Sequence, residues 1–177
     1  MILDDTKTQL LIIDIQEKLL NAVFNKEIVE KKSRILTKAF SILNLPIFVT
    51  EQYPQGLGES MEGIKDNAKT FIKTSFNALF DEELLSDLKS SNRNQIVVFG
   101  IETHICVHQT VASLIEKGFE VTVVSDACGS RSEAEYLQAL ACMKENGAKI
   151  KTTEMVIFEL LKTAKHPNFK EIQALIK

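Results

Sequence analysis

The sequence contains no apolar run close to the roughly 20 residues that a membrane-spanning helix needs, and its start lacks a basic segment followed by an apolar one. Basic residues are scattered and the net charge is −3, so the positive surface typical of nucleic-acid-binding proteins is missing. The three cysteines, Cys106, Cys128 and Cys142, form no disulfide framework and have no paired metal-ligand spacing. We therefore expect a soluble cytoplasmic protein that binds neither membranes nor nucleic acid.

A glycine-rich phosphate-binding motif is also missing. The first apolar run is followed by Asp14-Ile-Gln-Glu-Lys-Leu instead of Gly-x-Gly-x-x-Gly, and no P-loop lysine motif occurs. A phosphate group needs the close backbone approach that glycine permits. We therefore expect no nucleotide and no other cofactor, so that the chemistry is left to side chains.

Short apolar runs alternate with segments long enough for crossover helices. With 45% hydrophobic and 25% charged residues, the chain fits one compact domain that spans all 177 residues. The alternation predicts an α/β fold with three α/β/α layers around a central parallel sheet of about six strands. The strands are expected at residues 10–13, 47–50, 70–72, 96–99, 121–125 and 149–151.

The helical segments carry start and stop signals. Gly118 and Gly147 follow helical patterns, where a left-handed residue would end a helix, and Ser132 precedes acidic residues as an N-cap. The longest irregular region covers residues 51–69, and loops of that length are usually functional or mobile. Helices are expected at residues 26–43, 81–89, 104–117, 132–146, 153–161 and 169–176.

Cys106 lies where a buried strand runs through a tight turn into a helix. The first turn of a helix favours an anion, which would lower the pKa of the thiol and raise its reactivity. Asp14 and Lys73 also end apolar runs, and the carboxyl ends of parallel strands share one crevice where the strand order reverses. The alternatives are ordinary: a buried cysteine packs as a small apolar residue, an aspartate caps a helix, and a lysine is solvated.

The motifs around these three residues resemble those of isochorismatase-like cysteine hydrolases: Asp14 in Asp-Ile-Gln, Lys73 in Lys-Thr-Ser-Phe and Cys106 in Gly-Ile-Glu-Thr-His-Ile-Cys-Val. The resemblance spans nearly the whole chain and is closest to the subgroup of isochorismatase domain-containing proteins. It implies a three-layer fold with Rossmann-like strand order and a catalytic triad. Further matching segments are residues 50–58, 130–132, 152–154 and 166–170.

The resemblance also implies how the site works. Asp14 would accept the proton of the Cys106 thiol, the thiolate would attack a carbonyl carbon, and Lys73 would orient the pair. The oxyanion would be held by the backbone N–H groups of Glu102 and Cys106, with a cis peptide bond between Ile101 and Glu102. Relatives that bind a metal carry Asp and His near the second strand, which this chain lacks, and relatives that cleave isochorismate lack the cysteine. No metal is therefore expected, and Cys106 indicates amide-like substrates.

Gln16, Tyr53 and Phe76 are candidates for binding a small-molecule substrate, although Gln16 is equally compatible with a solvated position, and the two aromatic residues with the core. His104 and His108 lie one helical turn apart, which is a weak metal signal.

Cys142 is expected to be buried packing, and Cys128 is expected to be structural, with a redox role as the alternative. The helix over residues 132–146 presents Ala134, Leu137 and Ala141 together with Cys142, either to the sheet or to a subunit partner.

The sequence as a whole indicates a metal-independent cysteine hydrolase that acts on a small amide through a covalent thioester-type intermediate. We expect it to form a homodimer or a larger homo-oligomer. The alternative is a non-catalytic or redox-responsive protein-interaction module that keeps the hydrolase fold.

Overall fold

Six parallel strands form one sheet in the computed structural model, which describes residues 2–177. The order is β3-β2-β1-β4-β5-β6, so the order reverses between β1 and β4. This confirms the expected fold, and each predicted strand is present. The strands are β1 (Thr8–Ile13), β2 (Ile47–Gln52), β3 (Lys69–Lys73), β4 (Gln95–Gly100), β5 (Glu120–Val124) and β6 (Lys149–Lys151).

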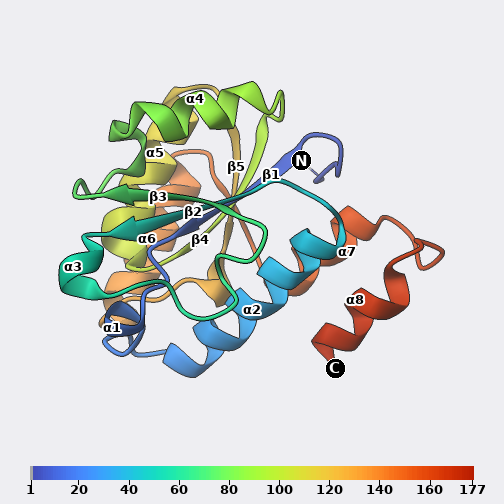
Figure 1. The fold of residues 1–177 in the computed structure, drawn as a ribbon, viewed down its shortest axis with the longest axis horizontal. Coiled ribbons are helices and arrows are strands. Elements are labelled where there is room, and N and C mark those ends of the chain that lie inside the picture. Colours follow the sequence, from blue (N-terminus) through green and yellow to red (C-terminus); the bar gives the residue numbers. More distant parts are fainter. Residues whose placement is uncertain (1) are drawn as a thin grey trace.

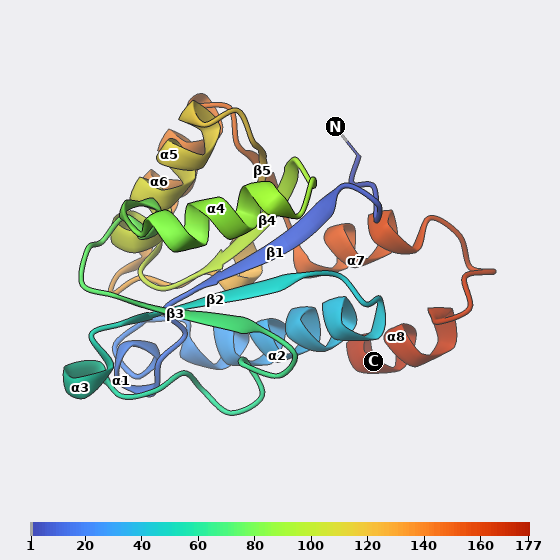
Figure 2. The same cartoon turned by 45° about the horizontal axis from the view of Figure 1, so that its top comes forward.

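Helices cover both faces of the sheet (Figures 1 and 2). In both views α4, α5 and α6 lie on one face, and α2, α7 and α8 lie on the other. The central strands β1 and β4 are buried along their whole length, as expected for strands covered on both faces. The helices are α1 (Glu17–Leu20), α2 (Lys26–Ile42), α3 (Pro54–Leu57), α4 (Glu82–Ser90), α5 (His108–Glu116), α6 (Glu133–Glu145), α7 (Thr153–Leu161) and α8 (Phe169–Ile176).

The local sequence explains several helix ends. Gly118 and Gly147 have φ of +86° and +105° just beyond α5 and α6, and the side chain of Ser132 accepts a hydrogen bond from the backbone N–H of Glu135. These three predictions are confirmed. The predicted helix at residues 104–117 differs, because its first part is a π-helical turn, η2 (Thr103–Val107), and the α-helix begins at His108.

Two short helices, α1 and α3, stand at the carboxyl ends of the strands, and α3 lies within residues 51–69, where the sequence predicted irregular structure. α1 and α3 lie close together at this end of the sheet (Figure 1). The side-chain amide of Gln16 donates to the carbonyls of Gln52 and Gly58, and its oxygen accepts from the N–H of Gln52. The buried amide of Gln16 therefore binds both ends of residues 52–58, which are called the α3 segment below.

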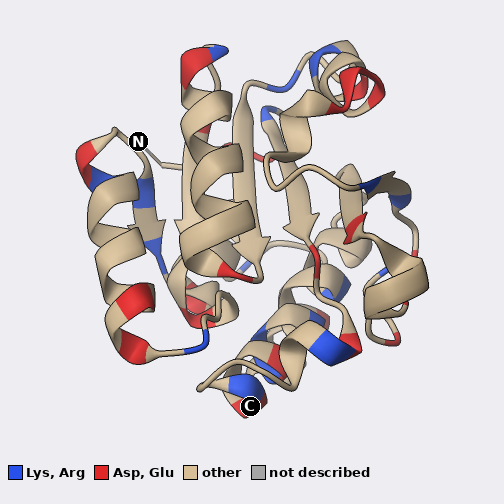
Figure 3. Ribbon diagram, turned by 90° about the vertical axis from the view of Figure 1, so that its left-hand side faces the viewer, with Lys and Arg blue, Asp and Glu red and all other residues tan. Residues whose placement is uncertain are grey.

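Charged residues of both signs are distributed over the helices and loops (Figure 3). Lys65 pairs with Glu51 and Glu59, and Lys69 pairs with Glu83 and Asp87. Within residues 2–177 no helix has the length and apolar composition that a membrane crossing requires.

The last residue of β4, Gly100, lies against the backbone of Ile13 at the end of β1. The N–H of Ile101 donates to the carbonyl of Ile13 at 2.9 Å, and a Cβ placed on Gly100 would lie 2.0 Å from that oxygen. Gly100 also has φ of +148°, which L side chains rarely adopt. Glycine is therefore required at position 100, where the carboxyl ends of the two central strands lie side by side.

Gly100→Ala is expected to destabilise the fold severely because both the backbone angle and the contact with Ile13 oppose a side chain. The matched control is Gly118→Ala, which also has positive φ but meets nothing within 4 Å. The control should cost about 1 kcal/mol in free energy of unfolding, and Gly100→Ala at least about 2 kcal/mol more. Urea denaturation measures both, and equal losses would show that the close approach is not a constraint.

Candidate active site

Asp14 lies directly after β1 with its side chain fully buried. Its backbone is left-handed, with φ of +52°, a conformation that aspartate tolerates better than most residues. One carboxylate oxygen accepts a hydrogen bond from the Thr50 hydroxyl at 2.7 Å, and the other accepts from the Lys73 ammonium at 2.7 Å. The carboxylate is thus held from two neighbouring strands.

Lys73 ends β3, and its side chain is 2% exposed. The ammonium donates to Asp14, to the side-chain oxygen of Gln52 at 2.6 Å and to the carbonyl of Ser75 at 3.1 Å. An ammonium has three donors. Each of the three has an acceptor, so the charge is fully compensated inside the protein.

Cys106 reaches the same place from β4, through the π-helical turn. It is 6% exposed, its thiol hydrogen-bonds to the Asp14 carboxylate, and the backbone N–H of Glu102 also bonds to its sulfur. The peptide bond between Ile101 and Glu102 is cis, as the resemblance implies. The structure therefore brings Asp14, Lys73 and Cys106 together at the point where the strand order reverses.

The pKa of Cys106 differs from the sequence-based expectation. Burial raises the pKa of the thiol to about 12, and the negative charge of Asp14 adds to the rise. The charge of Lys73 and the N–H of Glu102 lower it, but they do not outweigh the first two effects. The expected lowering of this pKa is therefore wrong for the resting protein, in which Cys106 is a thiol hydrogen-bonded to the Asp14 carboxylate.

A pocket of about 260 Å³ opens beside Cys106. Most of its surface is apolar, and Tyr53 and Phe76 are both about half exposed at its walls. Two of the proposed substrate-binding residues thus lie beside the sulfur. The lining residues are Leu19, Gln52, Tyr53, Leu57, Phe76, Glu102, Ile105 and Cys106.

Gln16, the third proposed substrate-binding residue, does not line this pocket. Its side chain is fully buried, and its amide is taken up by the backbone of Gln52 and Gly58. Its observed contacts position the α3 segment, which carries Tyr53 and Leu57 to the pocket wall.

Sequence reasoning missed Thr50, Gln52 and Arg131. Thr50 and Gln52 hold Asp14 and Lys73, and Arg131 donates through Nε to the Glu102 carboxylate at 2.8 Å. A usable signal existed for the first two. They are alternate polar residues at the end of a strand, so they face the same side of the sheet.

The remaining candidates have other partners. His104 pairs through Nδ1 with the Ser130 hydroxyl, and within residues 2–177 no group of three or more His, Cys, Asp or Glu side chains could hold a metal ion. Cys128 is fully buried, and burial raises its pKa to about 12. Cys142 was expected to be buried, but it is half-buried, because α6 turns Ala139 and Met143 to the core.

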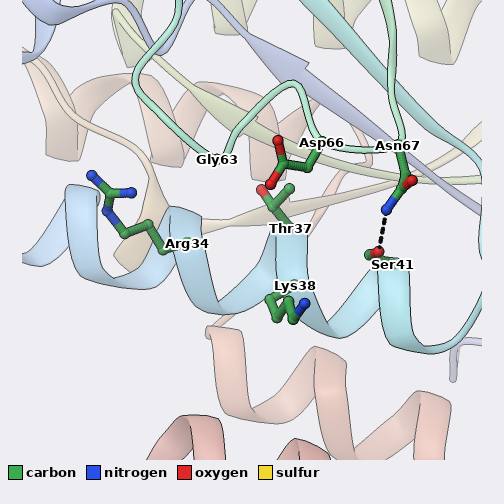
Figure 4. A pocket seen from close by; sticks show the side chains of 7 residues that line it. All are labelled: Arg34, Thr37, Lys38, Ser41, Gly63, Asp66 and Asn67. Carbon is green, nitrogen blue, oxygen red and sulfur yellow. Dashed lines mark hydrogen bonds between the residues drawn. The ribbon is translucent and has the colours of Figure 1, made fainter.

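A second pocket, of about 210 Å³, lies between α2 and the loop before β3 (Figure 4). Arg34 and Lys38 come from the helix, Asp66 comes from the loop, and Asn67 donates to the Ser41 hydroxyl at 2.8 Å. It shares no lining residue with the pocket beside Cys106, and no cysteine is among its described lining residues.

Comparisons with known proteins show the family and the fold of the chain. Residues 8–155 match the family model described as isochorismatase domain. The Xenopus laevis protein named isochorismatase domain-containing protein 2 is 42% identical, with 98% of this chain and 85% of that protein covered. Among solved structures, MAR1 ribonuclease from Caenorhabditis elegans has a TM-score of 0.92 at 35% identity, covering 99% and 92% of the two chains.

The bacterial protein YcaC is also similar in structure. YcaC from Pseudomonas aeruginosa, solved with covalent acrylamide, has a TM-score of 0.93 at 26% identity and covers 98% of this chain and 91% of its own. The Escherichia coli protein, described as an octameric hydrolase of unknown specificity, has a TM-score of 0.90 at 25% identity, with coverage of 98% and 95%.

Asp14→Asn is expected to lower the pKa of Cys106 and Lys73→Met to raise it, because the charge of Asp14 raises this pKa and that of Lys73 lowers it. The measurement is peptide-resolved alkylation of Cys106 over a pH series, with circular dichroism to confirm folding. The rate profile should move to lower pH in the first variant and to higher pH in the second. Cys128 and Cys142 serve as internal controls. Profiles that stay in place would show that the three groups are not coupled.

Proposed function

The chain belongs to the isochorismatase family, and from this premise we propose that it is a metal-independent cysteine hydrolase of small amides. The observation that carries the proposal is the contact of the Cys106 thiol with a carboxylate that is itself paired with a buried ammonium. A nucleophile, a base within hydrogen-bonding reach and a group that orients the base are the parts that nucleophilic catalysis requires. The adjoining pocket provides room for a small substrate.

In the proposed first step Asp14 takes the proton of the thiol while the sulfur attacks the carbonyl carbon of the amide. The electron pair of the carbonyl moves to its oxygen, which the backbone N–H groups of Glu102 and Cys106 stabilise. When the C–N bond breaks, protonated Asp14 gives its proton to the leaving amine. A thioester on Cys106 remains.

In the second step Asp14 accepts a proton from water, and the resulting hydroxide attacks the thioester. The C–S bond breaks, the carboxylic acid leaves, and the sulfur recovers a proton from Asp14. The sum is amide plus water to acid plus amine, and the enzyme returns to its resting state. Lys73 keeps its charge throughout and holds the carboxyl in place.

The raised pKa of the thiol is compatible with this sequence. The proton moves between sulfur and carboxyl within one hydrogen-bonded pair, so the nucleophile forms without loss of a proton to the solvent. Acrylamide adds to nucleophiles through its vinyl carbon, so the covalent acrylamide of YcaC supports a reactive nucleophile on a similar fold.

A phosphodiester substrate is disfavoured, although the similar Caenorhabditis elegans structure is named a ribonuclease and two others carry that name as a putative one. Among the described residues that line the pocket beside Cys106, none is Lys, Arg or His. Binding of RNA depends largely on cationic side chains that offset the phosphate charges. The lining therefore favours the proposed small amide over RNA.

Cys106→Ala is expected to abolish amide hydrolysis, and Asp14→Asn to slow it by about 10³-fold, as for loss of a general acid–base group. Turnover is followed as ammonia release from a panel of small amides, with a chelator present because no metal is assigned a role. Mass spectrometry of quenched reactions should find the acyl adduct on Cys106 alone. Cys142→Ala is the matched control and should retain activity. An adduct without turnover would instead favour the non-catalytic module.

We propose that the protein assembles into a homodimer or larger homo-oligomer through α6. Ala134, Leu137 and Ala141 form an apolar face on this helix that is exposed in the single chain, with Leu137 55% exposed. One similar protein is described as octameric.

Light scattering should give a mass that is a multiple of 19.9 kDa, and Leu137→Glu should shift it towards the monomer because a charge would be buried at the contact. The control Glu145→Gln, also exposed on α6, should leave the mass unchanged. A monomer at all micromolar concentrations would contradict this assignment.

A further inference from the structure

The pocket beside Cys106 is lined by few charged residues for a site that is expected to bind a polar substrate. Among the described residues that line it, Glu102 is the one carboxylate and no cationic side chain is present. The other walls are Leu19, Leu57, Ile105 and the two aromatic residues. A substrate therefore meets apolar surface, one amide group and one carboxylate.

Neither Lys73 nor Lys18, on the surrounding elements, lines the pocket. The three donors of Lys73 are taken by Asp14, Gln52 and the Ser75 carbonyl. Lys18, next to Leu19, uses one of its three N–H groups to donate to the Gly56 carbonyl at 2.8 Å. A carboxylate group on a substrate would therefore find no ammonium among the described residues that line the pocket.

Arg131 is a further cation near the pocket, and it forms an ion pair with the lining residue Glu102. Its Nε donates to the Glu102 carboxylate at 2.8 Å, with the Glu102 side chain 13% exposed and that of Arg131 63% exposed. Glu102 is one of the residues that line the pocket, whereas Arg131 is not, and its side chain lies mostly in solvent. The negative residue of the pair therefore belongs to the pocket lining, and its positive partner lies outside that lining.

We propose that this arrangement selects small uncharged amides and rejects amides that carry a carboxylate, and that the Glu102–Arg131 pair determines the selection. The inference rests on the proposed function and names its substrate class. A substrate carboxylate would lose its hydration beside an apolar wall and a like charge, without a partner to replace the water. An uncharged amide loses much less.

Three isosteric amides test the proposal: 4-methylpentanamide is uncharged, succinamate is anionic and 3-amidinopropanamide is cationic. In the wild type, kcat/KM should be highest for the uncharged compound and lowest for succinamate. Glu102→Gln leaves Arg131 uncompensated, so the succinamate to 4-methylpentanamide ratio should rise roughly fivefold, the upper end for a partly exposed charge. Arg131→Ala exposes the carboxylate and should favour the cation by a similar factor.

Three further variants separate selection from structural damage. Glu102→Asp keeps the charge and should keep the wild-type order of substrates. The double variant Glu102→Gln/Arg131→Ala removes both charges, so its ratios should lie between those of the two single variants. Glu133→Gln removes an exposed carboxylate of the neighbouring helix and should move no ratio. A general loss of folding would lower all three rates together and leave their ratios unchanged.

Alkylation provides a measurement that does not depend on turnover. Iodoacetamide and iodoacetate differ in charge, and the ratio of their rates at Cys106, compared with that at half-buried Cys142, reports the preference of the pocket. Iodoacetate should be disfavoured at Cys106 by about fivefold relative to Cys142, and Glu102→Gln should reduce this factor.

The two assays have distinct failures. If no amide is turned over while the alkylation preference is present, the proposed hydrolase fails and the charge selection stands. If iodoacetate reacts at Cys106 as readily as at Cys142, or if Glu102→Gln moves neither ratio, the selection is overturned whatever the enzyme hydrolyses.

Discussion

The buried ion pair between Asp14 and Lys73 is the interaction on which the rest of the structure depends. It joins the ends of β1 and β3 across β2, with side chains 0% and 2% exposed. Burying two charges is costly unless further hydrogen bonds satisfy them, and here Thr50, Gln52 and the Ser75 carbonyl do so. Removing one partner would leave an uncompensated charge, at a cost of roughly 3–5 kcal/mol. The residues that stabilise this end of the sheet are therefore the same residues that the proposed reaction uses.

The same ion pair influences the pKa of Cys106. A sulfur beside an isolated ammonium would ionise readily, but this ammonium already belongs to a carboxylate, and the burial of the thiol disfavours its charge. The charge of Asp14 and the charge of Lys73 therefore act on the pKa of the thiol in opposite directions.

The sequence was sufficient for the sheet, because alternating apolar runs and crossover segments allow few arrangements, and for the meeting of Asp14, Lys73 and Cys106, because parallel strands end at one edge. It did not predict the high pKa of Cys106, which depends on the burial of the sulfur and on how close Asp14 lies. Nor did it predict the bonds of Gln16, whose partners lie tens of residues away in the chain and meet it only after folding. The exposure of Cys142 depends on which face of α6 packs against the core. The apolar residues of α6 are spread around the helix, so the sequence does not determine that face.

The way in which the α3 segment is attached has a consequence for how such proteins diverge. Its attachments use backbone groups: the carbonyls of Gln52, Gly56 and Gly58, and the N–H of Tyr53, which donates to the Lys73 carbonyl. The side chains of Tyr53 and Leu57, which form the pocket wall, take no part in them. Mutations that alter this wall leave the anchoring hydrogen bonds intact, so new specificities can evolve without a change in the scaffold or in the residues around Asp14.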